Sequence, residues 1–200
     1  MRAEIVSIGT ELLMGQIVDS DARAIGALLP EFGIDHTHRQ TVGDNLARIV
    51  EALRLALGRS DVVFTIGGLG PTQDDLTREA IALALGDELV SDPDIESGLR
   101  EFFASRKLPW VDSQLRQTRR PASARIIENP NGTAPGLLAQ KDGKVVIAMP
   151  GPPGEFLPML QGPVRDFLAQ VAGDQVMVSR VLRVAGMGEA AIESALGDLT

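Results

Sequence analysis

The sequence contains no cysteine and no tyrosine, and its aromatic residues are six phenylalanines and one tryptophan. The absence of cysteine excludes disulfide bonds, a thiol nucleophile and zinc sites built from thiolates, and it fits a reducing compartment. We therefore expect a cytoplasmic protein. The shortage of aromatic rings predicts an aliphatic core and argues against a base-stacking surface for single-stranded nucleic acid.

Positive charge and long apolar runs are scarce as well. Nineteen Lys and Arg stand against 27 Asp and Glu, which gives a formal net charge of −8. Nucleic-acid binders need a positive surface for phosphate contacts, so we expect no nucleic-acid partner. No run approaches the roughly 18 apolar residues of a membrane span, and the apolar stretch at Ile5–Ile8 is too short for a signal peptide. We expect no membrane partner.

What the sequence does contain is the composition of a globular chain, with 44% hydrophobic residues, and an alternation of strand and helix patterns. Residues 3–8, 61–66 and 144–149 are almost continuously apolar and β-branched, as in strands covered on both faces. Helical periodicity separates them, and Asp142-Gly143 is a two-residue hairpin signal. These patterns predict a three-layer α/β sandwich with a mixed, mostly parallel sheet.

The helix boundaries and the domain division follow from local signals. Ser20 and Asp44 are typical N-caps, and Gly33 and Gly58 are typical C-terminal stops. Polar helical segments at 94–106 and 113–120 predict an excursion from the sheet, and a long helix is predicted at 154–171. A strand at 176–185 and one last helix cannot close a core of their own. We therefore expect one domain over residues 1–172 and the beginning of a second over 173–200.

Glycine-rich turns follow the strands whose carboxyl ends should meet at one edge of the sheet, where ligands of open α/β sheets bind. Such turns, followed by helix N-termini, can offer backbone amides to a phosphate, although each single turn could be simple punctuation. The loops match neither the dinucleotide fingerprint nor the P-loop. The predicted phosphate-binding residues are Gly9, Thr10, Glu11, Gly67, Gly68, Gly70, Thr72, Gly151 and Pro152.

Asp74 and Asp75 come directly after the central glycine loop. One of them could simply cap the next helix, because Thr72 and Asp75 have capping-box spacing. Two carboxylates beside an anion-binding loop would however repel a phosphate unless a divalent cation lies between them. Asp44 and Glu155 could add oxygen ligands or a general base, or could be caps. The predicted metal ligands are Asp44, Asp74, Asp75 and Glu155.

Two further groups have both a functional and a structural interpretation. His36 and His38 share one face of a strand and could bind a metal, but an exposed strand face is the more common reason for such a pattern. The cluster of Arg116, Arg119 and Arg120 could meet a phosphate or form a solvated helix face. The sequence leaves these alternatives open.

Five segments together resemble a known family. They are Ile8–Val18, Val42–Asn45, Thr65–Thr77, Gly132–Gly136 and Met149–Glu155. In this order they resemble the N-terminal domain of the CinA (competence/damage-inducible protein A) family, which has a molybdopterin-binding fold. The resemblance covers residues 1–168, and residues 182–199 are similar to the start of the small KH-like α+β domain that follows in CinA proteins.

The resemblance implies a three-layer α/β fold, homodimers and a metal-dependent ADP-ribose pyrophosphatase that uses magnesium, cobalt or manganese. The implied substrate is thus a nucleotide-sugar diphosphate. Asp44 and Asp75 match the positions that mark the catalytic pocket in molybdopterin-binding relatives. The amidase domain of full-length CinA proteins lies outside these 200 residues, so its activity is not assigned here.

The chain departs from the family pattern at three places. Asp19-Ser20-Asp21 stands where Asn-Thr-Asn is common, Thr118 where alanine is usual, and Ala190 where serine is common. Two other functions compete with hydrolysis. The same pocket could belong to a module that binds a molybdopterin-type cofactor, or to a non-catalytic protein linked to competence or DNA damage.

Overall fold

The apolar strands predicted from the sequence form the centre of the main sheet. The computed structural model describes residues 1–172, 181 and 183–197. In this part of the chain the main sheet has six strands, in the order β2-β1-β3-β8-β7-β6. The strands are β1 (Arg2–Ile8), β2 (Asp35–Val42), β3 (Val62–Ile66), β6 (Ala124–Ile127), β7 (Gly136–Lys141) and β8 (Lys144–Met149).

The sheet is mixed and mostly parallel, as predicted. Strand β1 pairs in parallel with β2 and β3, and β3 pairs in parallel with β8. Strands β7 and β6 extend the sheet in antiparallel fashion. The β7–β8 hairpin turns at Asp142 and Gly143, both with positive φ, as the Asp-Gly signal predicts. The sequence did not predict β6, whose four residues are too few for a periodic pattern.

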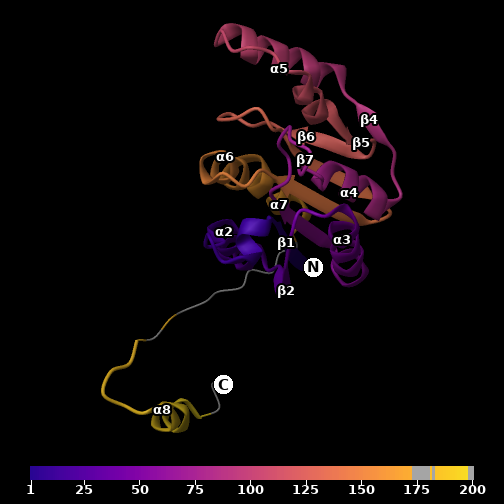
Figure 1. Ribbon diagram of the computed structural model, residues 1–200. Coiled ribbons are helices and arrows are strands. Elements are labelled where there is room, and N and C mark those ends of the chain that lie inside the picture. The colour runs from indigo at the N-terminus through magenta and orange to yellow at the C-terminus, as the bar shows by residue number, and fades with distance from the viewer. Residues whose placement is uncertain (173–180, 182, 198–200) are drawn as a thin grey trace.

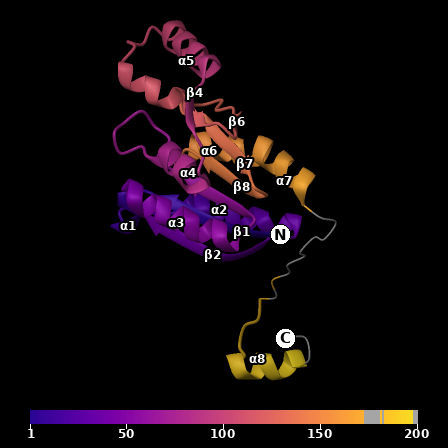
Figure 2. The same ribbon diagram turned by 90° about the vertical axis from the view of Figure 1, so that its right-hand side faces the viewer.

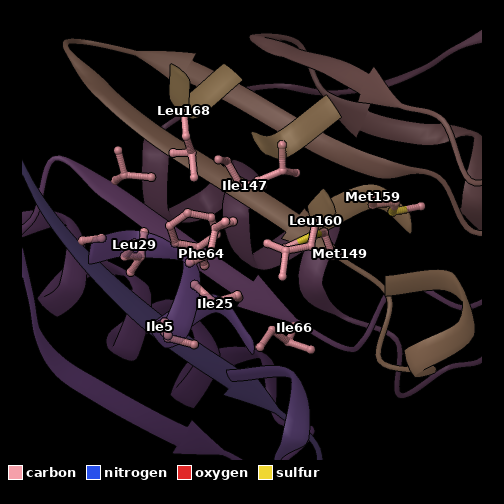
Figure 3. Packing of buried hydrophobic residues seen from close by; sticks show 14 of the residues in the cluster. Ile5, Ile25, Leu29, Phe64, Ile66, Ile147, Met149, Met159, Leu160 and Leu168 are labelled. Carbon is pink, nitrogen blue, oxygen red and sulfur yellow. The ribbon is translucent and has the colours of Figure 1, made fainter. Parts of the chain in front are cut away.

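Helices cover both faces of the sheet and complete the predicted three layers (Figure 1). Helix α2 (Ser20–Leu28), the 3₁₀ turn η1 (Leu29–Phe32), α6 (Pro153–Met159) and α7 (Arg165–Val171) pack on one face. Helices α3 (Leu46–Arg59) and α4 (Thr77–Leu85) pack on the other. Alternate residues of each strand therefore enter different cores, and Phe64 lies among Ile5, Ile25 and Leu29 on the α2 side (Figure 3).

The long helix predicted at 154–171 is interrupted. Between α6 and α7 the segment η3 (Leu160–Val164) forms a π-helical turn. Pro158 and Pro163 lie inside this stretch, and each lacks the N–H that a regular α-helical hydrogen bond needs. The wider turn accommodates the two prolines and keeps one continuous helical rod against the sheet.

Three of the predicted helix boundaries are wrong. Helix α2 is capped by Asp19 and not by Ser20, because Asp19 Oδ1 accepts the Ala22 amide at 2.9 Å. Helix α3 is capped by Asn45 and not by Asp44, and it continues past Gly58. Gly33, with φ of 60°, does end η1 as predicted. The shift at α3 leaves the Asp44 carboxylate free for contacts at the edge of the sheet.

The predicted excursion forms a small unit beyond the sheet, where Figures 1 and 2 both show α5. It contains β4 (Leu89–Ser91), α5 (Pro93–Ser105), the 3₁₀ helix η2 (Asp112–Thr118) and β5 (Arg119–Pro121). Strands β4 and β5 pair in antiparallel fashion, so the helix predicted at 113–120 is a 3₁₀ helix followed by a strand. Trp110 packs edge-on against Phe103, with ring centroids 5.7 Å apart.

The last part of the chain is described only in part. The strand predicted at 176–185 falls mostly outside the described residues. The predicted final helix is α8 (Glu189–Leu196), none of whose residues is buried. The division at residues 172 and 173 and the KH-like second domain stay predictions. No helix in the described ranges is both long and apolar enough to cross a membrane.

An ion pair with a buried carboxylate and a partly exposed guanidinium joins β1 to the last residue of α3. Glu4 is fully buried on β1, and its carboxylate accepts hydrogen bonds from Arg59 Nε at 2.8 Å and Arg59 Nη2 at 2.6 Å. Gln40 Nε2 on β2 donates a further bond at 2.8 Å. Burial opposes ionisation of Glu4, but the hydrogen bonds and charge of Arg59 and the bond from Gln40 outweigh it, so the pKa of Glu4 lies below its usual value.

We predict that Glu4→Gln lowers the free energy of unfolding by about 2 kcal/mol at pH 7, because the charge-assisted bonds to Arg59 are lost. The ionised Glu4 stabilises the fold above its unfolded-state pKa, and this contribution disappears as pH falls through the lower folded-state pKa. The difference between wild type and variant should therefore shrink from pH 7 to pH 3 in urea titrations. Glu96→Gln, which breaks the exposed Glu96–Arg100 pair, is the control and should change stability by under about 0.5 kcal/mol.

Candidate functional site

A cleft of about 750 Å³ opens where β1, β3 and β8 end. Parallel pairing of these strands places their carboxyl ends at one edge, so the loops after Ile8, Ile66 and Met149 converge there. Thr133 and Ala134, from the loop between β6 and β7, complete the wall. The volume lies within the range of small-molecule sites, which is about 300 to 1,000 Å³.

The structure gathers the predicted site residues at this cleft. All of them line it except Thr10: Gly9, Glu11, Asp44, Gly67, Gly68, Gly70, Thr72, Asp74, Asp75, Gly151, Pro152 and Glu155. Thr10 supports one of them, since its amide and its hydroxyl donate to Asp44 Oδ2 at 2.9 and 2.8 Å. The short helix α1 (Thr10–Leu13) thus holds the Asp44 carboxylate.

Few of the backbone amides that were predicted to bind phosphate are free to do so. Five amides donate inside the protein, namely Gly9 to Val42 O, Thr10 to Asp44, Gly67 to Met149 O, and Gly70 and Thr72 to Asp75. Among the predicted phosphate-binding residues, Pro152 has no N–H, and the amides of Glu11, Gly68 and Gly151 have no acceptor within the described chain. An anion in this cleft therefore meets few free amide donors.

The loop after β3 needs its glycines for its own packing. Gly67 and Gly68 have φ of 92° and 66°, the left-handed region that favours glycine. A Cβ on Gly67 would overlap the Ile8 carbonyl oxygen, and one on Gly68 would overlap Thr77 Oγ1. The buried Thr77 hydroxyl donates to Gly67 O at 2.8 Å. These glycines allow the loop to pack between β1 and α4.

Asp75 braces this loop. Its Oδ1 accepts the Gly70 amide at 2.7 Å, and its Oδ2 accepts the Thr72 amide at 2.8 Å and the Thr72 hydroxyl at 2.5 Å. Arg116 Nη2 donates to the Asp75 carbonyl at 3.1 Å. The predicted capping box is absent here, because α4 begins at Thr77 and Asp75 bonds back into the loop. The predicted catalytic role of Asp75 stays a prediction.

A buried arginine holds the loop from behind. The guanidinium of Arg78 donates to the carbonyls of Leu69 and Gly70, and its side chain is almost fully buried. Burial lowers the pKa of Arg78 to about 10, so it stays protonated at neutral pH. Arg78 is not among the residues that line the cleft. The guanidinium therefore holds the loop by its carbonyls and does not offer its positive charge to the cleft.

The other predicted metal ligands keep oxygen atoms available. Asp44 Oδ1 has no partner in the described chain, because both bonds from Thr10 go to Oδ2. Glu155 Oε2 accepts a bond from Asn129 Nδ2, and Oε1 has none. Asp74 is exposed, and the bond from the Thr72 hydroxyl lowers its pKa. Asn129 was not predicted, because a loop asparagine has no distinctive pattern.

The sequence analysis missed Asp19 and Asp21 as cleft residues. Asp19 forms an ion pair with Arg39 on β2, and the buried Asp21 is the second residue of α2. Burial raises the pKa of Asp21, the charge of Asp19 adds to this, and a bond from Ser20 partly opposes it. Both residues follow the loop after β1, so the edge rule that found Glu11 could have found them.

The electrostatic character of the cleft is strongly one-sided. Its lining residues include no Lys, Arg or His. They do include these carboxylates: Glu11, Asp19, Asp21, Asp44, Asp74, Asp75 and Glu155. At neutral pH a diphosphate entering alone would meet only like charge and the few free amides. The cleft lining therefore offers no positive side chain to a phosphate.

The predicted set of four metal ligands is not preassembled. In the described part of the chain, no three His, Cys, Asp or Glu side chains converge as a metal-ligand group. The four carboxylates come from two loops and the first turn of α6, and each accepts a hydrogen bond from a nearby residue. The donor set nevertheless fits a hard divalent cation, because magnesium is commonly held by one or two carboxylates and completed by substrate phosphates and water.

The histidine and arginine candidates lie away from the cleft lining. The two histidines lie on β2, an edge strand of the sheet. Ala3 of β1 pairs with His36 and Glu4 pairs with His38, so the register between the two strands shifts at this point. Burial lowers the pKa of His36. Arg116 and Arg119 form ion pairs with Glu79 at 3.3 and 3.5 Å, and Arg120 pairs with Asp92 at 2.7 Å. The arginines therefore tie the excursion together and to α4.

Comparison with known protein families matches residues 4–170 to the family described as "Probable molybdopterin binding domain". A competence-damage inducible protein of Moorella thermoacetica is 45% identical over 200 residues, which cover this whole chain and 48% of that protein. A CinA-like protein of Desulfovibrio desulfuricans is 45% identical over 201 residues and is covered to 47%. The chain thus spans about half the length of the curated relatives it matches.

Solved structures agree with these matches. The protein CinA of Thermoplasma acidophilum superposes with a TM-score of 0.77 and 37% identity, covering 83% of this chain and 98% of that one. The molybdopterin biosynthesis enzyme MoaB of Thermus thermophilus shares the fold alone, with a TM-score of 0.53, 22% identity and coverage of 88% and 99%. The fold, the family match and the 37% identity to a CinA structure establish that this chain belongs to the CinA family, within its molybdopterin-binding-type domain.

Proposed function

We propose that the chain hydrolyses the diphosphate bond of ADP-ribose with the help of a divalent cation. The observation that carries this proposal is the cleft at the ends of β1, β3 and β8, lined by carboxylates and by no basic side chain. Such a cleft accepts a phosphate ligand only as its metal complex. The CinA motifs supply the nucleotide-sugar diphosphate as the substrate class.

Asp44 and Asp74 would hold the cation, and Glu155 lines the same cleft. The all-oxygen donor set favours magnesium or manganese over cobalt. When bound, the cation would neutralise charge on the diphosphate and polarise its P–O bonds. Asp75 positions the loop on which Asp74 stands, through its bonds to the amides of Gly70 and Thr72.

The reaction consumes one water and yields AMP and ribose 5-phosphate. The oxygen of the water attacks one phosphorus, and the bond from that phosphorus to the bridging oxygen breaks. Glu155, with Oε1 free of partners, is the proposed acceptor of the water proton. The free amides of Gly68 and Gly151 are the proposed donors to phosphate oxygens. The homodimer and the cytoplasmic location stay predictions.

We predict that magnesium and ADP-ribose stabilise the protein only together. The carboxylates form no complete ligand set without phosphate oxygens, and phosphate is repelled without the cation. At about 100 times the dissociation constant, the pair should raise Tm by roughly 5–10 °C, and either one alone by under about 1 °C. Differential scanning fluorimetry with EDTA, with magnesium, with ADP-ribose and with both measures this.

Product analysis in the same mixtures decides the reaction. AMP and ribose 5-phosphate should appear only where magnesium is present. A molybdopterin that stabilises the chain without magnesium, while ADP-ribose neither binds nor reacts, would favour the cofactor-binding alternative. Equal binding of ADP-ribose in EDTA and in magnesium would contradict the electrostatic argument.

We predict that Asp74→Asn lowers kcat/KM for ADP-ribose about a hundredfold or more while Tm changes by under about 2 °C, because Asp74 is exposed and braces no buried group. Asp112→Asn is the matched control, since Asp112 is also exposed and lies outside the cleft. Initial rates of AMP release and thermal melts measure both effects. Full activity of Asp74→Asn would remove this residue from the proposed cation site.

For Asp75→Asn we predict loss of both activity and stability. The amide group can replace only one of the two carboxylate oxygens as an acceptor, so either Gly70 or Thr72 faces an N–H donor. We expect a decrease of about 1–3 kcal/mol in the free energy of unfolding. Urea denaturation measures it, and an unchanged unfolding midpoint would show that Asp75 does not brace the loop.

A further inference from the structure

Gln117 is a buried amide at the cleft for which the fold provides no partner. The residue is 1% exposed and lines the cleft beside the loop that carries Asp74. Its Oε1 is buried without a hydrogen-bond partner, and within the described chain its side chain makes no hydrogen bond. An unpaired buried polar group of this kind destabilises a protein.

The backbone on both sides of Gln117 is firmly held. Arg116 Nη2 donates to Asp75 O at 3.1 Å and to Glu79 Oε1 at 3.3 Å. The Thr118 hydroxyl donates to Leu115 O at 2.8 Å, and Thr118 O accepts the Asp92 amide at 2.8 Å. The backbone at Gln117 is therefore held by its neighbours, while the side-chain amide makes no hydrogen bond within the described chain. Rotation of that side chain toward the cleft breaks no hydrogen bond.

The chemistry of the cleft indicates which ligand group would use this amide. Gln117 is the only amide side chain among the lining residues, whose charged groups are all carboxylates. Carboxylates and phosphates only accept hydrogen bonds at neutral pH, whereas an amide both donates and accepts. Its natural partner is a group with the same dual capacity. In ADP-ribose the ribose hydroxyls and the adenine edge both have it, and the hydroxyls are the more numerous.

We propose that Gln117 binds a ribose hydroxyl of the nucleotide-sugar diphosphate and thereby contributes to substrate specificity. This assignment rests on the proposed function. The excursion that carries η2 thus supplies one wall of the site, and Arg116 connects that wall to the loop braced by Asp75.

The test compares Gln117→Leu with Gln114→Leu. Gln114 Oε1 is also buried without a partner, and Gln114 lies on the same 3₁₀ helix but does not line the cleft. Without ligand, both variants should melt at or above the wild-type temperature, because leucine removes an unpaired polar group. With ADP-ribose and magnesium, Gln117→Leu should raise KM about tenfold, and Gln114→Leu should leave KM and kcat unchanged.

Analogues of ADP-ribose that lack one ribose hydroxyl identify the contact. The wild type should discriminate about tenfold against one of them, and Gln117→Leu should lose that discrimination. A melting temperature of Gln117→Leu below that of the wild type would assign Gln117 to the fold and overturn the proposal. An unchanged KM in an active Gln117→Leu would overturn it too. A wild type that neither binds nor hydrolyses ADP-ribose would overturn the proposed function and this assignment together.

Discussion

The parallel pairing of β1, β3 and β8 is the constraint on which the rest of the molecule depends. Every residue of β3 is buried, and its alternate side chains enter both cores, with Phe64 on one face and Val63 on the other. Because all three strands run in one direction, the chain must leave each of them at the same edge. The convergence of the three loops, and with it the cleft, is a consequence of that pairing.

The carboxylates that line the cleft have no basic side chain beside them in the lining, because the nearby arginines lie behind the loops. The carboxylates of Asp44, Asp75 and Glu155 each accept a hydrogen bond from a neighbouring loop or helix, while Arg78 and Arg116 bind the central loop outside the lining. The basic side chains therefore stabilise the frame and leave the open face negative. The cleft is thus lined by carboxylates, while the loops around it are held by hydrogen bonds within the protein.

The glycines of the central loop show how one sequence feature can have two physical causes. Gly-Gly-Leu-Gly is typical of a loop whose backbone approaches a phosphate, and the sequence predicts amide donors there. The structure shows that Gly67 and Gly68 are required by contacts with Ile8 and Thr77, and that the Gly70 amide is already bound to Asp75. Composition and spacing alone cannot separate these causes, because both need the absence of a Cβ and a positive φ.

Periodicity and turn signals, which are local, predicted the layers, the mixed sheet, the hairpin at Asp142-Gly143 and most residues at the cleft edge. Only the tertiary structure decided that Asn45 and not Asp44 caps α3, that Asp75 braces the loop, and that Asp19, Asp21 and Gln117 belong to the cleft wall. The bond from Thr10 to Asp44 and the gathering of Asp19, Asp21 and Gln117 at one cleft join segments far apart in the chain, whereas the bonds to Asp75 close a turn within its own loop. No spacing rule records these contacts, since they exist only once the loops have packed.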